Sequence, residues 1–496
     1  MNITVQQNSR FLLAGALFLI YRNKYFTWHT LKSMLMKLPY VENKLISNAI
    51  ELEYSLQNNY TNMSRLPTTA LSLREVLEKT ECVRNKENDS KHTSGIIYND
   101  NEHHLNNMTA VFRKFATSNP LHPDIFPEVR EMEIDVINMV RHMFKGGQEV
   151  CGNITSGGTE SILLAIYTYR EWGRKNHGIT RPNIVAFNSV HPAFDKACHY
   201  FGITLRKVSS PFWMKLQIDW NTICVVSSAP TYSYGIIDPI DEVAAHCHLR
   251  GVPVHVDCCM GGFLLPFLPD NPVHFEKEGI TSISADSHKY GNSLKGSSVL
   301  LFKNWEYKQH QHFIKTDWEG GMYATPTLLG SKSGALIATT WASMLLMGEI
   351  KYSRIARTIR THILNIKKEF SENEDIEVIG DPQVNIIAFR SKSKALDIYK
   401  VVQNMKDWNL SVLTSPAAFH FCITSVHTDN IIQKFITDLK KAVEDVKSDP
   451  DAKLDGTLAI YGSAAKVENS MFTSEVVNQY VALLSSKTLL KFNRSL

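Results

Sequence analysis

A regular alternation of short β-rich runs with helical segments is the feature that most limits how this chain can fold. β-rich runs occur between residues 183 and 302 at "NIVAFN", "TLRKVS", "TICVVSS", "VPVHVD", "TSISAD" and "SVLLF", with helix-like pieces such as "PAFDKACHYFG" and "DPIDEVAAHCHLRG" between them. Helical periodicity also marks the preceding segments "PEVREMEIDVINMVRHMF" and "TESILLAIYTYREWGRK". This alternation predicts an α/β fold with a mostly parallel sheet that is covered on both faces.

The pattern changes after about residue 350 to that of a smaller α+β domain. A long helix is expected at "YSRIARTIRTHILNIKKEF", followed by strands at "VNIIAF" and "HFCIT" and helices at "ALDIYKVVQNM" and "NIIQKFITDLKKAVEDV". Because 496 residues exceed what one hydrophobic core usually serves, several units are expected. We predict an N-terminal apolar segment at 1–40, a second segment at 41–127, a large domain at 128–350 and a small C-terminal domain at 351–496. The polar, turn-rich residues 80–106 are expected to connect to the catalytic unit.

Charge and cysteine usage exclude some classes of protein. A net charge of +4 is too small for a chain of this size to indicate nucleic acid as a partner, and we predict none. The eight cysteines form no CxxC pair and no metal-like Cys/His spacing. They are interpreted as reduced, buried thiols of a cytosol-facing protein, and no metal site is predicted.

The N-terminus carries an apolar run, "FLLAGALFLIY", at residues 11–21. Its 11 residues fall short of the roughly 20 that span a bilayer. No clear small-residue cleavage site follows, which argues against a signal peptide. The continuation "RNKYFTWHTLKSMLMKL" mixes Lys, Arg, Trp, Phe and Leu, as interfacial helices do. Membrane attachment is the favoured interpretation, with a packed N-terminal helix or a signal sequence as alternatives.

Two glycines open the helix that begins at "ITSGGTES". Gly157, Gly158 and Thr159 place backbone N–H groups and the positive end of the helix dipole toward whatever lies in front of them. Such a cradle suits a phosphate. The alternative is an ordinary turn with a Ser/Thr cap.

Two charged residues follow neighbouring strands. Asp257 ends the apolar run "VPVHVD", where a carboxylate is costly unless it meets a cation such as a protonated pyridine nitrogen. Lys289 follows the next run in "SISADSHKYG". A lysine whose pKa is lowered by desolvation can attack an aldehyde as a neutral amine. The alternatives are an aspartate that caps a turn and a lysine at the surface.

His191, in "SVHPAFDKA", lies at a strand-to-helix junction, where an imidazole could stack on an aromatic ring. The alternative is a capping or surface histidine. Ligands of open α/β sheets collect at the carboxyl ends of the strands, where all these motifs fall. A phosphate loop, a stacking histidine, a carboxylate and a lysine in that order match each functional group of pyridoxal phosphate.

From about residue 94 to 465 the chain resembles the sphingosine-1-phosphate lyases, a pyridoxal-phosphate family related to the group II amino-acid decarboxylases. The resemblance rests on "SNPLHPDIFP", "TSGGTESILLA", "HVDCCMGGF", "TSISADSHKYG", "TDWEGGMYATPT" and "HFCIT". It implies an aspartate-aminotransferase-like large domain of fold type I with a smaller α+β C-terminal domain.

The resemblance also implies roles for individual residues. Lys289 is expected to be the Schiff-base lysine, Asp257 the partner of the pyridinium, and His191 the stacking residue. The other residues expected to bind the cofactor are Gly157, Gly158, Thr159 and His288. The expected catalytic residues are Lys289, Tyr98 and His122, and the expected substrate-binding residues are His122, Lys295, Tyr323 and Lys332.

The implied reaction is a retro-aldol cleavage of the C2–C3 bond of a phosphorylated long-chain base, which gives a long-chain aldehyde and phosphoethanolamine. The alternatives are a related aldolase or decarboxylase with a changed substrate pocket, or an inactive pseudoenzyme. The resemblance further implies a homodimer with sites at the subunit interface, to which residues 41–127 contribute. It implies an endoplasmic reticulum membrane location with the catalytic part in the cytosol, or a cytoplasmic one if the N-terminus does not anchor.

The chain departs from the family pattern in three places. Where the family reads "HKYGYAPKGSS" this chain has "HKYGNSLKGSS", so that Asn292 and Leu294 stand for an aromatic residue and a proline. The family string "CSTPQFPHGVIDP" has become "VSSAPTYSYGIIDP", which contains Tyr234. Lys332 replaces an arginine, and an ammonium cannot bind phosphate in the bidentate manner of a guanidinium. These departures concern the substrate rather than the cofactor.

Overall fold

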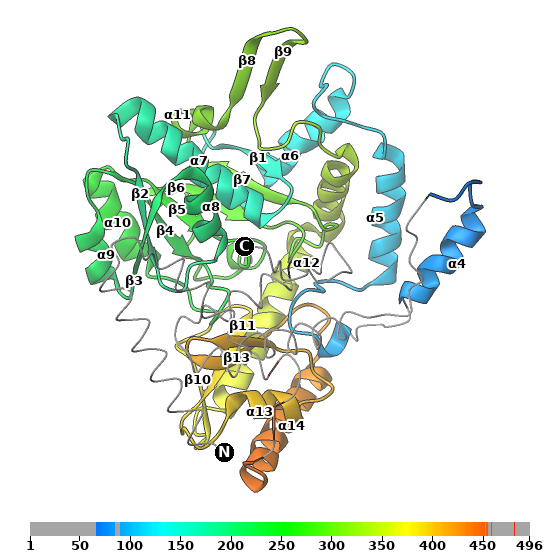
Figure 1. Cartoon of the computed structure of the whole chain (residues 1–496), viewed down its shortest axis with the longest axis vertical. Helices are drawn as coiled ribbons and strands as arrows, with labels where there is room; N and C mark the ends of the chain where they lie inside the picture. The colour runs from blue at the N-terminus through cyan, green and yellow to red at the C-terminus, as the bar shows by residue number, and fades with distance from the viewer. Residues whose placement is uncertain (1–65, 85–89, 452, 455–457, 459–480, 482–496) are drawn as a thin grey trace, which may run out of the picture. The chain divides into compact units, whose positions relative to one another are not determined.

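The computed structural model describes residues 66–84, 90–451, 453–454, 458 and 481 (Figure 1). These residues fall into two compact units. One unit includes α4 (Leu73–Arg84) and residues 414–417, and the other includes residues 90–413 and 418–451. The apolar run at residues 11–21 lies outside the described residues. Among the helices that the structure describes, none is long and apolar enough to cross a membrane.

A seven-stranded sheet forms the centre of the larger unit, with the strand order β1-β7-β6-β5-β4-β2-β3. Its strands are β1 (Cys151–Thr155), β2 (Asn183–Phe187), β3 (Thr204–Val208), β4 (Thr222–Ser228), β5 (Val254–Asp257), β6 (Ile280–Ala285) and β7 (Ser298–Phe302). β7 pairs antiparallel with both of its neighbours, and the remaining pairs are parallel. The sheet is therefore mostly parallel, as the sequence predicted.

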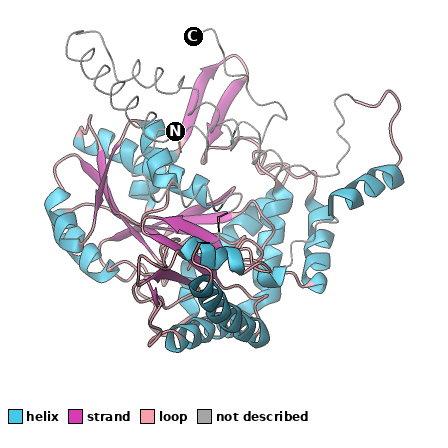
Figure 2. Ribbon diagram, turned by 60° about the horizontal axis from the view of Figure 1, so that its bottom comes forward, coloured by secondary structure: helices cyan, strands magenta, loops and turns pink. Residues whose placement is uncertain are grey.

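Helices cover both faces of this sheet (Figure 2). On one face, α7 (Gly158–His177) and α8 (Ala193–Phe201) pack on a core that includes Ile184 and Ala186 of β2. The alternate residue Val185 points to the opposite face and is also fully buried. α10 (Ile240–Arg250) contacts β4 and β5, and α9 (Pro211–Gln217) contacts β2 and β3. Burial on both faces explains the continuous apolar character of these strands.

Glycines end the helices that return the chain to the sheet. α7, α8 and α10 are followed by Gly178, Gly202 and Gly251, each in the left-handed conformation with φ 65°. Glycine adopts this conformation without steric cost, which fixes the end of each helix. Each helix therefore ends where the next strand can start, and the parallel strands have their carboxyl ends at the same edge of the sheet.

A second sheet of four strands, with the order β10-β11-β13-β12, forms the small C-terminal part. Its strands are β10 (Ile376–Val378), β11 (Ile386–Ser391), β12 (Ser411–Thr414) and β13 (Ala417–Cys422), and its helices are α13 (Ile398–Asn404) and α14 (Asp429–Ser448). Phe421 of β13 stacks on Phe435 of α14 with ring centroids 4.5 Å apart. This contact holds α14 on the sheet.

The remaining elements lie around the large sheet. They are η1 (Ser90–His92), α5 (Glu102–Phe115), α6 (Pro127–Met143), η2 (Leu265–Phe267), α11 (Trp305–Lys308), η3 (Gln309–Gln311), β8 (Phe313–Trp318), β9 (Gly321–Thr325) and α12 (Gly334–Glu369). β8 and β9 form an antiparallel hairpin that stands clear of the large sheet in Figure 1. α12 is interrupted at Gly348, which has φ 59° and ψ 168°.

The main differences from the sequence-based expectations concern helices and strands whose sequences show no clear hydrophobic periodicity. β1, the β8–β9 hairpin and α9 were not anticipated. α5 begins inside the segment expected to be a connection, and α12 begins at Gly334, well before the helix expected at 352. The domain boundaries at residues 40, 127 and 350 stay predictions. The seven cysteines whose side chains the structure describes are all free thiols, and only Cys151 is not buried.

Candidate active site

A cavity of about 400 Å³ lies at the carboxyl edge of the seven-stranded sheet. Every residue predicted to bind the cofactor lines it, together with one of the predicted catalytic residues. The lining residues are Tyr98, Ser156, Gly157, Gly158, Thr159, Glu160, Ile162, His191, Ser228, Pro230, Tyr232, Asp257, Cys259, Met260, Asp286, His288 and Lys289. The ends of β1, β2, β4, β5 and β6 thus converge on one site.

The glycine loop fits tightly against the strand ends. Gly157 has φ 148°, a value that side chains rarely permit, and a Cβ there would lie 3.1 Å from the His288 ring. A Cβ on Gly158 would lie 2.8 Å from both carboxylate oxygens of Asp286. Gly157 caps α7 without any side-chain hydrogen bond. The first-turn N–H groups of α7 are therefore available to an anion, as the sequence predicted.

Buried hydrogen bonds hold this loop in place. The Ser161 hydroxyl lies 2.6 Å from that of Thr155 on β1 and 2.9 Å from that of Ser298 on β7. The Glu160 carboxylate accepts hydrogen bonds from the backbone N–H of Ser156 at 2.6 Å and of Leu328 at 3.2 Å. The first turn of α7 is thereby fixed to two strands and to the segment that follows the β8–β9 hairpin.

Asp257 lines the cavity at the end of β5 and is 8% exposed. One of its oxygens, Oδ1, accepts hydrogen bonds from the Cys259 N–H at 3.1 Å and from the Ser284 hydroxyl at 3.4 Å. Its other oxygen, Oδ2, has no hydrogen-bond partner among the described residues. A half-satisfied carboxylate in a cavity suits a cationic ligand such as a protonated pyridine nitrogen.

His191 and Tyr98 line the cavity from two other segments. The Ala193 N–H donates a hydrogen bond to His191 Nδ1 at 3.1 Å, which fixes the orientation of the ring. Tyr98 packs edge-on against Tyr290, with ring centroids 5.0 Å apart, and Lys295 Nζ lies 4.4 Å from the centroid of its ring. Burial raises the pKa of the Tyr98 phenol, so that this group stays protonated at neutral pH.

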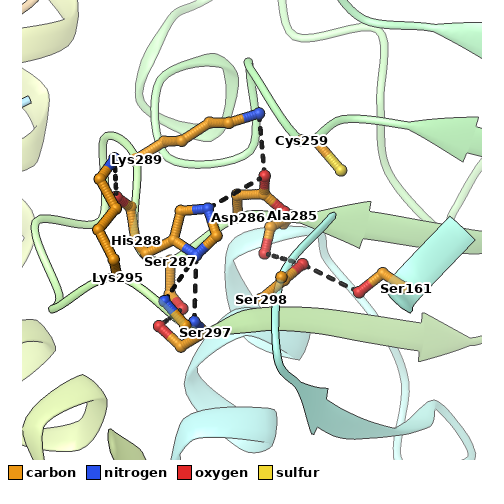
Figure 3. Close-up of polar contacts among 12 residues, drawn as sticks. Ser161, Cys259, Ala285, Asp286, Ser287, His288, Lys289, Lys295, Ser297 and Ser298 are labelled. Carbon is orange, nitrogen blue, oxygen red and sulfur yellow. Dashed lines mark hydrogen bonds and ion pairs between the residues drawn. The ribbon is translucent and has the colours of Figure 1, made fainter. Parts of the chain in front are cut away.

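Lys289 lies in the cavity, but its protonation state differs from the sequence-based expectation. Its Nζ is 2.9 Å from Asp286 Oδ2 (Figure 3). Burial alone lowers the pKa of Lys289, as expected, but the Asp286 carboxylate outweighs burial and the pKa lies above its ordinary value. The expectation of a lowered pKa was wrong because Asp286 had not been identified as a neighbour.

His288 is held by the loop that follows it. The backbone N–H groups of Ser297 and Gly296 donate to His288 Nδ1 at 3.1 and 3.4 Å. Neutral His288 therefore carries its proton on Nε2, which faces Asp286 at 3.6 Å (Figure 3). Lys295 donates to the His288 carbonyl oxygen at 3.4 Å. The pKa of Lys295 lies below its ordinary value, because the ammonium is partly buried and close to Lys289.

Four of the predicted residues do not line the cavity of the chain that carries them. Lys295 contacts the cavity residue His288, whereas the other three lie in other segments. His122 is exposed in the turn before α6. Tyr323 lies on β9, and the centroid of its ring is 6.2 Å from that of Phe313. Lys332 forms an ion pair with Glu133 of α6 at 2.9 Å. Within one chain, the structure therefore does not bring these three substrate-binding candidates to the cofactor candidates.

Asp286 and Glu160 also line the cavity, although neither was predicted from the sequence to belong to the site. Both stood inside quoted motifs, "SADSHKYG" and "SGGTES". Asp286 is the first residue after β6 and Lys289 is the fourth. The turn that they form brings both side chains into the cavity. The signal was available, since a carboxylate at a strand end three residues before a lysine is placed to contact it.

The cavity fits pyridoxal phosphate at each end. The uncapped first turn of α7 and the two glycines would hold the phosphate, and Asp257 Oδ2 would accept from the ring nitrogen. The Lys289 amine, at the same edge of the sheet, would be bonded to the aldehyde carbon. The His191 ring, fixed by Ala193, would lie on the pyridine. These roles stay predictions for the individual residues.

Comparisons with known proteins identify the class and the family. The pyridoxal-dependent decarboxylase conserved domain matches residues 108–392. A glutamate decarboxylase structure from Lactobacillus brevis covers 80% of this chain and 97% of its own, with a TM-score of 0.69 at 19% identity, which shows a shared fold. The fold, the site and this match define a pyridoxal-phosphate-dependent enzyme of the decarboxylase-related class.

The finer relationship is to one branch of that class. Sphingosine-1-phosphate lyase 1 of Rattus norvegicus is 36% identical over 479 residues, which cover 91% of this chain and 84% of the relative. The lyase of Saccharomyces cerevisiae is 34% identical, over 84% of this chain and 74% of its own. A solved lyase structure from Burkholderia pseudomallei has a TM-score of 0.77 at 31% identity, covering 86% of this chain and 98% of its own. The chain belongs to the sphingosine-1-phosphate lyase family.

Proposed function

We propose that this enzyme cleaves the C2–C3 bond of sphingosine 1-phosphate and related phosphorylated long-chain bases, giving a long-chain aldehyde and phosphoethanolamine. The observation that carries the proposal is the 36% identity to a named lyase over 91% of the chain. The cavity supports it, because it combines an anion cradle, a carboxylate and a lysine at one sheet edge. The departures at Asn292 and Leu294 are not among the residues that line the cavity, so these groups are unchanged.

The cofactor supplies the electron sink. Bound pyridoxal phosphate provides an aldehyde that condenses with amines and a protonated ring that withdraws electrons from the bond to be broken. Asp257 would keep the ring nitrogen protonated, because a carboxylate beside that nitrogen favours its charged form. The α7 N–H groups and Thr159 would hold the phosphate, and His191 would contact the ring.

Two of the catalytic candidates hold protons where the reaction needs an acid. Lys289, once displaced by the substrate amine, is an ammonium, and the Tyr98 phenol is protonated. Both are therefore placed to donate a proton to the carbon that remains after the aldehyde leaves. The remaining catalytic candidate is His122, and we assign to its imidazole the role of the base that takes the 3-hydroxyl proton.

We further propose a homodimer in which His122, Tyr323 and Lys332 of one subunit reach the cavity of the other. None of the three lines the cavity of its own chain. Side chains of the β8–β9 hairpin also expose apolar surface, with Ile314 65% and Met322 83% exposed. Exposed apolar surface of this kind is typical of a protein contact. The family resemblance, which places the sites at a subunit interface, supports the arrangement.

Subunit mixing tests this arrangement. Lys289→Ala and Tyr323→Ala homodimers are each expected to be inactive, whereas a random mixture contains hybrid dimers with one intact site. Activity is expected to recover to about a quarter of the wild-type value. A mixture that stays inactive although hybrid dimers are present would contradict shared sites.

We also propose that residues 1–40 attach the protein to the endoplasmic reticulum membrane, with the catalytic part in the cytosol. The apolar run "FLLAGALFLIY" and the basic, aromatic residues after it support this proposal. Flotation of the full chain with phospholipid vesicles, compared with a chain that begins at residue 41, provides the test. Equal flotation of both chains would contradict it.

An assay of the purified chain with pyridoxal phosphate and sphingosine 1-phosphate tests the reaction. Stoichiometric long-chain aldehyde and phosphoethanolamine are expected, and Lys289→Ala is the matched inactive control. Release of carbon dioxide from an amino acid, without aldehyde from the lipid, would instead indicate a decarboxylase. Bound cofactor without either product would indicate a pseudoenzyme.

A further inference from the structure

Asp286 is a buried acid to which the proposed reaction, as described so far, gives no role. Its side chain is 2% exposed and lies at the carboxyl end of β6. A Cβ on Gly158 would come within 2.8 Å of both of its oxygens, so the glycine loop closes over the carboxylate. Figure 3 shows Lys289 Nζ and His288 Nε2 directed at it, at 2.9 and 3.6 Å. The carboxylate is thus fixed where the Lys289 amine rests.

Asp286 is the one acid with a lowered pKa among the described groups that act on Lys289. Cys259, after β5, Tyr98, before α5, and Cys422, on β13, also face it, and burial raises the pKa of each. These three are neutral at neutral pH. The other neighbours are Lys295 and His288, which bring no negative charge.

The charge on Asp286 is secured by the same contacts. Burial alone raises the pKa of this carboxyl, but Lys289 and His288 outweigh burial and the pKa lies below its usual value. Asp286 is therefore a poor proton acceptor at neutral pH, and Lys289 cannot pass its proton to it. A proton that leaves Lys289 therefore goes to a group other than Asp286, such as water or the reacting carbon.

An ammonium has no lone pair and cannot add to a carbonyl carbon. Lys289 must first lose one proton; its nitrogen then adds to the aldehyde, and the aldehyde oxygen leaves as water. In the proposed reaction, on which this argument rests, the substrate amine displaces Lys289, and a long-chain aldehyde is then released in the same cavity. A neutral lysine there would condense with the product.

We propose that Asp286 is a positioning residue that holds displaced Lys289 as an ammonium and so protects it from the aldehyde product. The 2.9 Å ion pair, its burial and the glycine loop that closes over it carry the proposal. The same contact gives the lysine a fixed resting place between turnovers. In this view the ion pair slows the first reaction of Lys289 with the cofactor as well, because both reactions need the neutral amine.

The test uses the full chain without cofactor and hexanal as the probe. Hexanal and cyanoborohydride are added at pH 7.5, and alkylation of Lys289 is followed by peptide mass spectrometry, with exposed Lys114 as the internal reference. Asp286→Asn removes the charge but keeps the shape, so that burial then lowers the pKa of Lys289. Alkylation at Lys289 relative to Lys114 is expected to rise at least about tenfold, which corresponds to one pKa unit.

Asp238→Asn is the matched control. Asp238 is another buried aspartate at this edge of the sheet, 9% exposed, but it hydrogen-bonds to the Ser228 N–H instead of to Lys289. Its variant is expected to alkylate at Lys289 at the wild-type rate. If Asp286→Asn also reacts at that rate while remaining folded by circular dichroism, the proposal is overturned.

A pH series on the wild-type chain decides the matter even if Asp286→Asn does not fold. Alkylation of Lys289 is expected to rise about tenfold per pH unit from pH 7 to about pH 10 without a plateau, because a raised pKa keeps the neutral fraction small. A plateau below about pH 9 would overturn the proposal. Neither measurement needs lyase turnover, so a failure of the proposed reaction would not be confused with a failure of this inference.

The loaded enzyme gives a second readout. After turnover of sphingosine 1-phosphate and reduction with borohydride, the fraction of Lys289 that carries the long-chain adduct is expected to be higher in Asp286→Asn than in the wild type. Equal fractions at equal turnover would count against a protective role.

Discussion

The carboxyl edge of the large sheet and the segment from β8 to the start of α12 contrast within one chain. At the sheet edge, Gly157 and Lys289, which are 132 positions apart, line one cavity. In the second segment, Tyr323 and Lys332 stand in equally specific motifs, yet neither lines that cavity. The first region therefore gathers the cofactor-binding candidates within one chain, whereas the second does not bring its substrate-binding candidates to them.

The difference follows from what positions each side chain. Parallel strands present their carboxyl ends at the same edge, so a motif directly after a strand is placed by the sheet itself. Tyr323 lies on the β8–β9 hairpin, which forms a two-stranded sheet separate from the large one, and Lys332 lies in the turn before α12. Such segments take their position from local contacts, and here also, we propose, from a second subunit.

The largest expected effect is at the sheet edge. Asp257→Asn removes the negative charge beside the ring nitrogen, so kcat for aldehyde release is expected to fall by about 10²- to 10³-fold, as for the loss of other charge-stabilising groups. Asp241→Asn, on exposed α10, is the matched control and is expected to retain wild-type kcat. A variant at 257 with unchanged kcat would show that the sheet edge is not the cofactor site.

The sheet-edge residues were predictable because their motifs adjoin recognisable strands. Alternation of apolar runs and helices gave the parallel sheet, and Gly157, Asp257 and Lys289 each follow a strand or open a helix. The error over the pKa of Lys289 has a different origin. Sequence shows that a lysine will be buried, but its charge depends on a neighbour at 2.9 Å, which only the turn geometry provides.

A smaller effect is expected in the second region, on stability. The Lys332–Glu133 pair is 13% and 14% exposed, and Glu133 Oε1 also accepts from the Ile154 N–H at 3.1 Å. Lys332→Met leaves this carboxylate unpaired and is expected to lower the free energy of unfolding by about 3 kcal/mol in urea denaturation. Adding Glu133→Gln is expected to restore at least about 1 kcal/mol of it. Strictly additive effects would show that the two residues do not interact.

The second region could not be predicted because its contacts are not periodic. The arginine-to-lysine departure suggested a weaker phosphate ligand, but no pattern indicated that Glu133, 199 positions earlier, would bind the lysine. The hairpin strands β8 and β9 have all or most side chains exposed, so they lack the alternation that marks a strand with one buried face.

The smallest expected effect is a pH dependence at the sheet edge. Burial, with a contribution from nearby Asp257, raises the pKa of Asp238 to about 7, although the Ser228 N–H opposes it. Between about pH 4 and 7 the folded chain then holds a proton that the unfolded chain has lost, so stability falls as pH rises and levels off above about 7.

Urea denaturation across this range measures the effect. The free energy of unfolding is expected to decrease by about 2 kcal/mol more between pH 5 and 7 for the wild type than for Asp238→Asn. Parallel pH profiles of the two proteins would mean that Asp238 is ionised throughout and that the acids at this edge do not interact.

Reductive trapping of the cofactor shows which lysine forms the imine. The full chain is loaded with pyridoxal phosphate and reduced with borohydride, and its peptides are mapped by mass spectrometry. One modified lysine, Lys289, is expected, with no modification in Lys289→Ala. A pyridoxyl group on another lysine, or none on the loaded wild-type chain, would contradict the role of Lys289 as the Schiff-base lysine.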